Sequence, residues 1–372
     1  MRVSSIWRAE HALISAGLLL LLGLAGCSDS HHAGGPPDEK GGSVASAEPS
    51  LHLTGRIHFN INTNDYERTR SFYRLLGFAN AIGPFPETNT LEMAHSMGMA
   101  EPYRMFAEII YLGAPDIDPM QLHVPTGRMI DLIHWREPAN TQAAYPGVNS
   151  LGIAKVVLGS SDLEADLARL AAAGYVPVAE PADREGRYAF ALLKDPAGTL
   201  LELREVPGQT PVESNGSFVT HIDHLAINVS DLGRSLAFYE VLGFVATNAA
   251  SRTSSLDEAL ALGLSEPFSV REAMLEHSGD GSRILLSEWL SPRDLTPPHA
   301  APINHPGMQR INYASMDIDQ DVATLRAMGV PFLSPTVRCC DGDRSTMGIA
   351  VFEDPDGTYL QMLGTVEPLQ AN

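Results

Sequence analysis

Cysteine and positive charge are both scarce in this sequence. Three cysteines in 372 residues are too few for a framework of disulfide bonds. Lys and Arg number 25 against 45 Asp and Glu, which gives a formal net charge of −20, and the basic residues form no run. Nucleic-acid backbones and anionic lipid surfaces require clustered positive charge, so we expect neither as a partner. The sequence also lacks a glycine-rich phosphate loop, a nucleophile elbow and a Cys–His pairing.

No apolar run is long enough to span a bilayer as a stable helix. The run from Ala16 to Leu24 follows Arg2 and Arg8 and has the length of a signal-peptide core. It ends in LAGC, which resembles the bacterial lipobox, so we expect residues 1–27 to be a lipoprotein signal peptide whose Cys27 is lipidated. Ser28, rather than Asp, then favours sorting to the outer membrane by the same resemblance. These features predict a periplasm-facing envelope lipoprotein whose membrane anchor is lipid.

Residues 28–52 contain mostly Gly, Pro, Ser and charged residues and have little to bury, so we expect a flexible tether. The adjacent cysteines Cys339 and Cys340 allow either a strained vicinal disulfide or two free thiols. The composition of the whole chain, with 44% apolar and 19% charged residues, is that of a globular protein. The length favours about two domains.

The sequence contains an internal repeat. HFNINTNDYERTRSFYRLLGF at 58–78 aligns without a gap with HLAINVSDLGRSLAFYEVLGF at 224–244. A shorter version occurs once more in each half, at 155–174 and 310–329, and leads to KDPAGTLLEL or EDPDGTYLQM. The chain therefore consists of four related modules.

Each module is predicted to run strand, helix, strands. In the third module Asp231 is suited to cap a helix, apolar residues follow at helical spacing, and Gly243 ends it. The strand HLAINV alternates about His224, and the DPxG segments predict tight turns that lead into short terminal strands. This pattern is a βαβββ unit.

Four βαβββ modules with FYxxLGF after the first strand and DPxGxxxE before the last resemble the vicinal oxygen chelate superfamily. This superfamily includes glyoxalase I, extradiol dioxygenases, methylmalonyl-CoA epimerase and bleomycin-resistance proteins. The resemblance covers roughly residues 53–366. It implies an α+β fold in which paired modules close into two half-open β-barrel cups. We expect one cup in a domain at 53–206 and the other in a domain at 219–366.

The resemblance also implies where metal ligands would lie, on the first and last strands of paired modules. Counting seven residues back from each helix-capping Asp, and seven on from each DPxG Asp, locates most of these positions. The first cup then offers His58, Asp131, Lys155 and Glu202, and the second offers His224, Leu285, Arg310 and Gln361.

The second cup is expected to bind a ligand rather than a metal. Arg310 has no lone pair to donate, and Leu285 removes another ligand. Arg310 with His224 and Gln361 forms a donor-rich set suited to a carboxylate or phenolate of a small molecule. Over both cups, the further residues expected to contact a small-molecule ligand are Lys155, the hydrogen-bonding Asn60, Asn62 and Asn228, and an aromatic wall of Tyr103, Phe268, Trp135 and Trp289.

The first cup leaves two alternatives open. His58, Asp131 and Glu202 could hold a divalent Fe, Mn, Ni or Zn ion, with Glu202 as ligand or catalytic base, provided that Lys155 is neutral. Alternatively, Lys155 pairs with Glu202 and Asp131 as an internal ion cluster that replaces the ion.

We therefore favour small-molecule binding, or an unassigned activity of the superfamily, without a conventional metal centre. The alternatives are a divalent-metal lyase, isomerase or dioxygenase that works in the first cup, and a structural envelope protein.

Overall fold

The computed structural model describes residues 51–121, 123–144, 147–184, 187–212, 216–339 and 345–366. The segment expected to be a signal peptide with Cys27, nearly all of the expected tether, and Cys340 lie outside these residues. Cys339 is disulfide-bonded. Among the described residues, no helix is long and apolar enough to cross a membrane.

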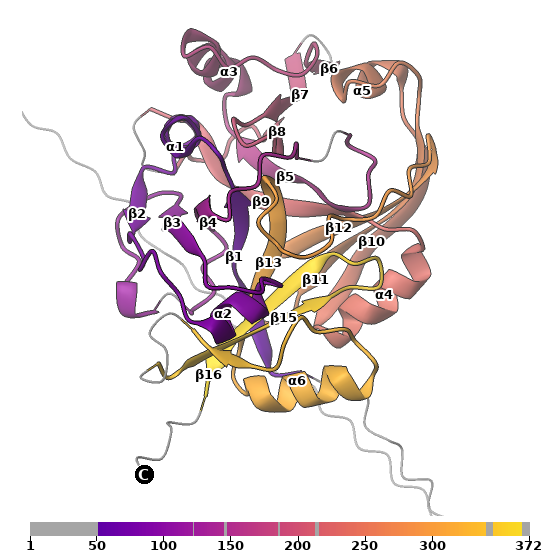
Figure 1. Cartoon of the computed structure of the whole chain (residues 1–372). Coiled ribbons are helices and arrows are strands. Elements are labelled where there is room, and N and C mark those ends of the chain that lie inside the picture. The colour runs from indigo at the N-terminus through magenta and orange to yellow at the C-terminus, as the bar shows by residue number, and fades with distance from the viewer. Residues whose placement is uncertain are drawn as a thin grey trace, which may run out of the picture. The chain divides into compact units, whose positions relative to one another are not determined.

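The four modules follow one another along the chain, as the repeat predicts (Figure 1). Module 1 contains β1 (Leu53–Asn62), α1 (Tyr66–Leu75), β2 (Asn80–Ile82), α2 (Leu91–Ser96), β3 (Arg104–Tyr111), a 3₁₀ turn (Pro119–Gln121) and β4 (Met129–Glu137). Module 2 contains β5 (Gly152–Ser160), α3 (Leu163–Ala172), β6 (Ala182–Arg184), β7 (Arg187–Lys194) and β8 (Leu200–Glu205). Module 3 contains β9 (Val219–Asn228), α4 (Leu232–Val241), β10 (Phe244–Thr253), α5 (Leu256–Ala261), β11 (Ser269–His277) and β12 (Arg283–Ser291). Module 4 contains β13 (Gly307–Ser315), α6 (Ile318–Ala327), β14 (Val337–Arg338), β15 (Met347–Glu353) and β16 (Tyr359–Thr365).

The main helix of every module starts at an aspartate. Asp65, Asp162, Asp231 and Asp317 each accept a hydrogen bond from the backbone N–H three residues on. That bond satisfies one of the amides that a helix start leaves unpaired. The cap predicted at Asp231 is confirmed, and the other three show that the repeat preserves this local signal.

The modules pair differently from the prediction. The first strands pair antiparallel, β1 with β13 and β5 with β9, and each pair forms the centre of an eight-stranded sheet (Figure 1). One sheet therefore joins modules 1 and 4, here called cup 1/4, and the other joins modules 2 and 3, here called cup 2/3. The expectation that residues 53–206 and 219–366 each form a cup is wrong. Strand pairing uses backbone groups that all four modules share, so the sequence repeat alone does not identify the partner.

Two fully buried tyrosines connect the cups. Tyr73 of α1 donates a hydrogen bond to Asp195 of module 2 (2.9 Å), and Tyr239 of α4 donates one to Asp354 of module 4 (3.2 Å). Each aspartate is the first residue of a DPxG turn. Burial raises the pKa of both carboxyl groups to about 6. The two modules within each half of the chain are thus joined by these buried contacts, whereas each sheet joins one module of the first half to one module of the second half.

We expect Tyr73→Phe to lower the free energy of unfolding by about 1.5 kcal/mol at pH 7, because a buried carboxylate loses a hydrogen-bond donor. Urea denaturation would measure the change. Tyr175→Phe is the matched control, since its hydroxyl donates to a backbone carbonyl in an exposed bond. An equal loss in both variants would contradict the role of the Tyr73–Asp195 contact.

Candidate functional site

Cup 1/4 brings together His58, Asp131, Arg310 and Gln361, from β1, β4, β13 and β16. Sequence reasoning located these positions on their strands but assigned them to two different cups. The strand register explains the new grouping. His58 on β1 lies opposite Asn312 on β13, and Asn312 lies beside Gln361 on β16.

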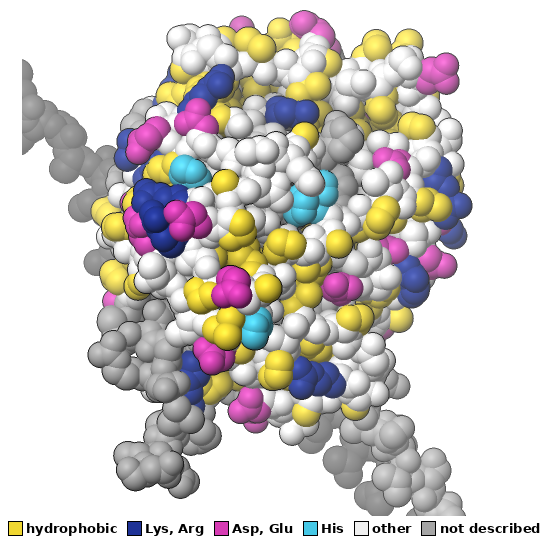
Figure 2. All heavy atoms as spheres, viewed as in Figure 1, with side chains coloured by type: hydrophobic (Ala, Val, Ile, Leu, Met, Phe, Trp, Pro, Cys, Tyr) yellow, Lys and Arg dark blue, Asp and Glu magenta, His cyan; other side chains and the backbone are white. Residues whose placement is uncertain are grey.

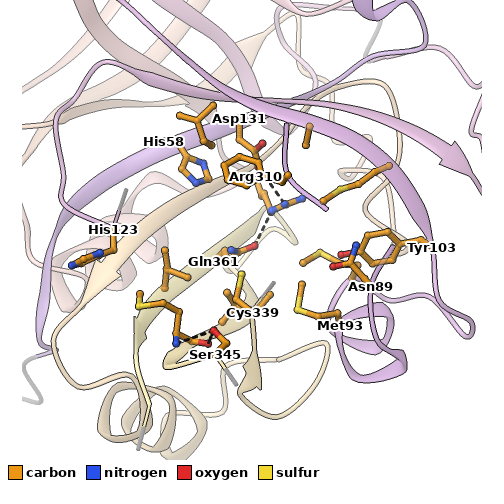
Figure 3. A pocket seen from close by; sticks show the side chains of 18 of the residues that line it. His58, Asn89, Met93, Tyr103, His123, Asp131, Arg310, Cys339, Ser345 and Gln361 are labelled. Atoms are coloured by element: carbon orange, nitrogen blue, oxygen red, sulfur yellow. Dashed lines mark hydrogen bonds and ion pairs between the residues drawn. The ribbon is translucent and has the colours of Figure 1, made fainter. Parts of the chain in front are cut away.

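These four residues line a cavity of about 370 Å³. Figure 3 shows His58, Asp131 and Arg310 together at one end of the cavity, with Asn89, Met93 and Tyr103 on another side. The rest of the lining is largely apolar: Phe85, Met93, Met97, Met105, Ala107, Ile109, Trp135, Met347, Ile349 and Leu363. Tyr103 and Trp135 belong to the predicted aromatic wall, and their rings meet edge to face with centroids 4.8 Å apart.

Arg310 is 4% exposed, yet few of its donors are used. Its Nε donates to Oε1 of Gln361 (2.9 Å). Its Nη2 lies 3.9 Å from Oδ2 of Asp131, which is beyond hydrogen-bond distance. Its Nη1 is buried without a hydrogen-bond partner. Burial lowers the pKa of Arg310, although Asp131 and Tyr103 raise it, and a guanidinium keeps its charge under such conditions. The cavity therefore contains a buried cation with spare N–H groups.

Asp131 faces Arg310 from the neighbouring module. Its Oδ2 accepts a hydrogen bond from Asn60 (2.5 Å), which in turn accepts one from Asn312. Burial raises the pKa of Asp131 to about 6, against the opposing effect of Arg310. Asn60 was expected to donate a hydrogen bond to a ligand. Instead, its amide positions Asp131.

Three other residues that line this cavity each have a buried polar atom without a hydrogen-bond partner: Nδ1 of His58, Nε1 of Trp135 and Nδ2 of Asn89. Burial and the charge of Arg310 lower the pKa of His58 to about 3, so its imidazole is neutral. The Trp135 and Asn89 atoms are hydrogen-bond donors. Asn89 was missed from the sequence, because it lies in a loop that the repeat does not include.

Cup 2/3 is organised differently, around a buried carboxylate. Glu202 is 1% exposed and accepts hydrogen bonds from Lys155 (2.5 Å) and from Nε of Arg204 (2.9 Å). Burial alone would raise the pKa of Glu202, but the two cations outweigh it and lower the pKa to about 2. The predicted Lys155–Glu202 ion pair is confirmed. Its expected third member, Asp131, lies in the other cup, and Arg204 takes its place.

Most other polar groups of cup 2/3 are also paired internally. Asn228 donates to two backbone carbonyls and accepts from Nε1 of Trp289 (2.9 Å), so it holds the fold rather than a ligand. Nδ1 of His224 contacts Asp223 (2.7 Å), while its Nε2 has no partner. Burial lowers the pKa of His224 to about 3. Arg252 pairs with Glu272 and Glu258 across the adjoining groove.

Neither cup fits a divalent metal. The predicted triad of His58, Asp131 and Glu202 is wrong, because Glu202 belongs to the other sheet. In cup 1/4 the guanidinium of Arg310 occupies one inherited ligand position, and it has no lone pair to give. In cup 2/3 Leu285 and Lys155 occupy two ligand positions, and both oxygens of Glu202 are already bonded. The described residues contain no group of three or more His, Cys, Asp or Glu side chains arranged to hold an ion.

Comparison with known proteins agrees with the fold. A model of the family described as "Glyoxalase/Bleomycin resistance protein/Dioxygenase superfamily" matches residues 55–203 and 221–362, well over half of the chain. The structure is similar to that of glyoxalase I from Zea mays, with a TM-score of 0.52 at 15% identity over 83% of this chain and 92% of that one. A putative dioxygenase from Bacillus subtilis gives a TM-score of 0.49 at 12% identity, covering 86% and 87% of the two chains. A search of curated proteins finds no significant match.

We expect Glu202→Gln to lower the free energy of unfolding by about 3 kcal/mol at pH 7, since it leaves the Lys155 charge without its partner. The folded-state pKa of Glu202 is depressed, so its stabilisation is present above the ordinary pKa and is lost as the pH falls through about 2. The difference from wild type should therefore shrink below about pH 4. Denaturation at several pH values would measure it.

The control is Glu276→Gln, which removes an exposed carboxylate. A difference that stays constant from pH 7 to pH 3, or equal losses in the two variants, would contradict the ion cluster.

Proposed function

Because the chain belongs to the glyoxalase/bleomycin resistance protein/dioxygenase superfamily, we propose that it binds a small organic molecule in cup 1/4 without a conventional metal centre. One observation carries this proposal. Buried polar atoms of Arg310, His58, Trp135 and Asn89 lack partners, and all four residues line the same apolar cavity. Unpaired buried donors cost free energy, so such a cluster favours a site completed by a ligand.

The second cup provides an internal comparison. Its counterpart tryptophan, Trp289, donates to Asn228, and its cations bind Glu202. Cup 2/3 thus satisfies within the protein the tryptophan N–H and the cation that cup 1/4 leaves open, whereas each cup keeps one unpaired histidine nitrogen. This contrast supports cup 1/4 as the binding site and a mainly structural role for the ion cluster of cup 2/3.

The size and surface favour a small molecule over a macromolecule. A cavity of about 370 Å³ lies in the usual range for small-molecule sites, and apolar walls with a few polar groups are typical of them. On the face in Figure 2, basic side chains are scattered among acidic ones and do not gather into a patch. This distribution supports the expectation that nucleic acid is not a partner.

The neutral fluorophore N-phenyl-1-naphthylamine tests whether the cavity accepts an apolar molecule. We expect one equivalent to bind with increased fluorescence, and Ala107→Leu to weaken binding at least about tenfold, because a larger side chain fills the cavity. Ala107 lines the cavity and is 1% exposed. Circular dichroism would check folding, and Ile349→Phe is a second cavity-filling variant.

Three outcomes would contradict the proposal. One is fluorophore binding that neither cavity-filling variant changes, and another is no binding of the fluorophore. The third is about one equivalent of tightly bound Fe, Mn, Ni or Zn in protein purified without chelator or affinity tag, lost in His58→Ala. That result would return a metal-dependent lyase, isomerase or dioxygenase to consideration.

We also propose that the protein is a lipoprotein that is anchored in the outer membrane through Cys27 and faces the periplasm. The LAGC motif after a short apolar run supports this proposal. The tether that follows would let the cups stand clear of the bilayer.

Cys27→Ala should remove the lipid and release the protein from the membrane fraction. Metabolic labelling with an alkynyl fatty acid, followed by fractionation, would measure both effects. Ser28→Ala serves as the control and should remain labelled. Equal labelling of the wild type and Cys27→Ala would overturn the anchor.

A further inference from the structure

We infer that the ligand of cup 1/4 is an apolar organic acid, whose carboxylate binds Arg310 and whose body fills the sulfur-rich chamber beside it. This inference rests on the proposed function and names the class of molecule that the site takes. Three features of the protein support it: the internal repeat, the geometry of Arg310 and the composition of the cavity wall.

The repeat shows what a cation at this position binds. Lys155 and Arg310 occupy the same position in modules 2 and 4, seven residues before the helix-capping Asp. Glu202 and Gln361 likewise correspond, seven residues after the DPxG Asp. In cup 2/3, Lys155 binds the carboxylate of Glu202 at 2.5 Å. In cup 1/4, the one side chain among the described residues that accepts a hydrogen bond from Arg310 is Gln361, whose amide is neutral.

Asp131 does not replace the missing carboxylate. Its nearest oxygen is 3.9 Å from Nη2 of Arg310 and already accepts a hydrogen bond from Asn60. Asp131 thus offsets part of the charge of Arg310 without accepting a hydrogen bond from it. Arg310 therefore keeps N–H donors that no carboxylate of the described residues accepts.

The unpaired donors of Arg310 match a carboxylate better than a single oxygen. Nη1 has no partner, and Nη2 has none within hydrogen-bond distance, while Nε is used by Gln361. Two parallel N–H groups of a guanidinium fit the two oxygens of a carboxylate. A phenolate or carbonyl oxygen would use this fork less fully.

The rest of the cavity lining favours a ligand whose remaining part is apolar. Four methionines, Met93, Met97, Met105 and Met347, line the cavity together with Ile109, Ile349 and Leu363. Thioether side chains are polarisable and make favourable contacts with aromatic rings. Figure 3 shows Met93 and Tyr103 lying away from the cluster of His58, Asp131 and Arg310, so the apolar body of the ligand would extend toward them, with the Asn89 amide as a second donor on that side.

An isosteric series tests the inference by isothermal titration calorimetry. The probes are 4-phenylbutanoate, 4-phenylbutanamide and 4-phenylbutan-1-ol, which share a body and differ in the polar end. We expect the acid to bind at least about tenfold more tightly than either neutral probe, because hydrogen bonds from a buried cation to an anion are the strong ones.

Gln361→Glu supplies inside cup 1/4 the carboxylate that Glu202 supplies in cup 2/3. We expect the affinity for 4-phenylbutanoate to fall at least about tenfold, and by a much larger factor than the affinity for neutral N-phenyl-1-naphthylamine, because the added carboxylate pairs with Arg310 and repels only the anion. Gln320→Glu adds the same charge on the exposed surface of α6 and should leave both affinities unchanged.

The outcomes separate the two proposals. If the neutral probes bind as well as the acid, or if Gln361→Glu leaves the affinity for the acid unchanged, the carboxylate assignment is overturned and binding in the cup stands. If neither the series nor the fluorophore binds, the proposed function itself fails.

Discussion

Antiparallel pairing between first strands from the two different halves of the chain is the constraint on which the rest of this structure depends. The β1–β13 and β5–β9 pairs form the centre of each sheet and decide which module faces which. Because first strands carry the residues at the base of each cup, this pairing also decides which side chains meet. Since each sheet takes one module from each half of the chain, neither half completes a cup by itself. The contacts of Tyr73 and Tyr239 connect the two modules within a half.

The two cups show how one scaffold can use charge in opposite ways. In cup 2/3 a buried glutamate satisfies two cations, and the polar groups are largely spent within the protein. In cup 1/4 a buried arginine meets an amide and a distant carboxylate, and donors remain unpaired around an apolar space. A buried cation with unused donors is costly unless something binds it. The difference between Glu202 and Gln361 therefore decides whether the cation of a cup is paired with a carboxylate of its own module.

Local signals in the sequence predicted local structure well. The four aspartate caps occur where the spacing indicated, because a hydrogen bond between residues three apart forms each cap. The cup-facing positions counted from these caps and from the DPxG turns also lie on the expected strands. The ion pair of Lys155 and Glu202 was also predictable, since both belong to one module. The partnership of Arg310 with Asp131 was not, because these residues lie in modules that are distant in the chain.

The sequence by itself determined that the chain contains four βαβββ modules, which residue each module offers to a cup, and that Arg310 and Leu285 are unsuited to hold a metal. Only the tertiary structure decided how those offers combine into one apolar cavity with unpaired donors and one ion cluster. The physical reason is that strands pair through backbone N–H and C=O groups, which are the same in every module. Side chains record what a strand carries, whereas the fold of the whole chain sets which strand lies opposite.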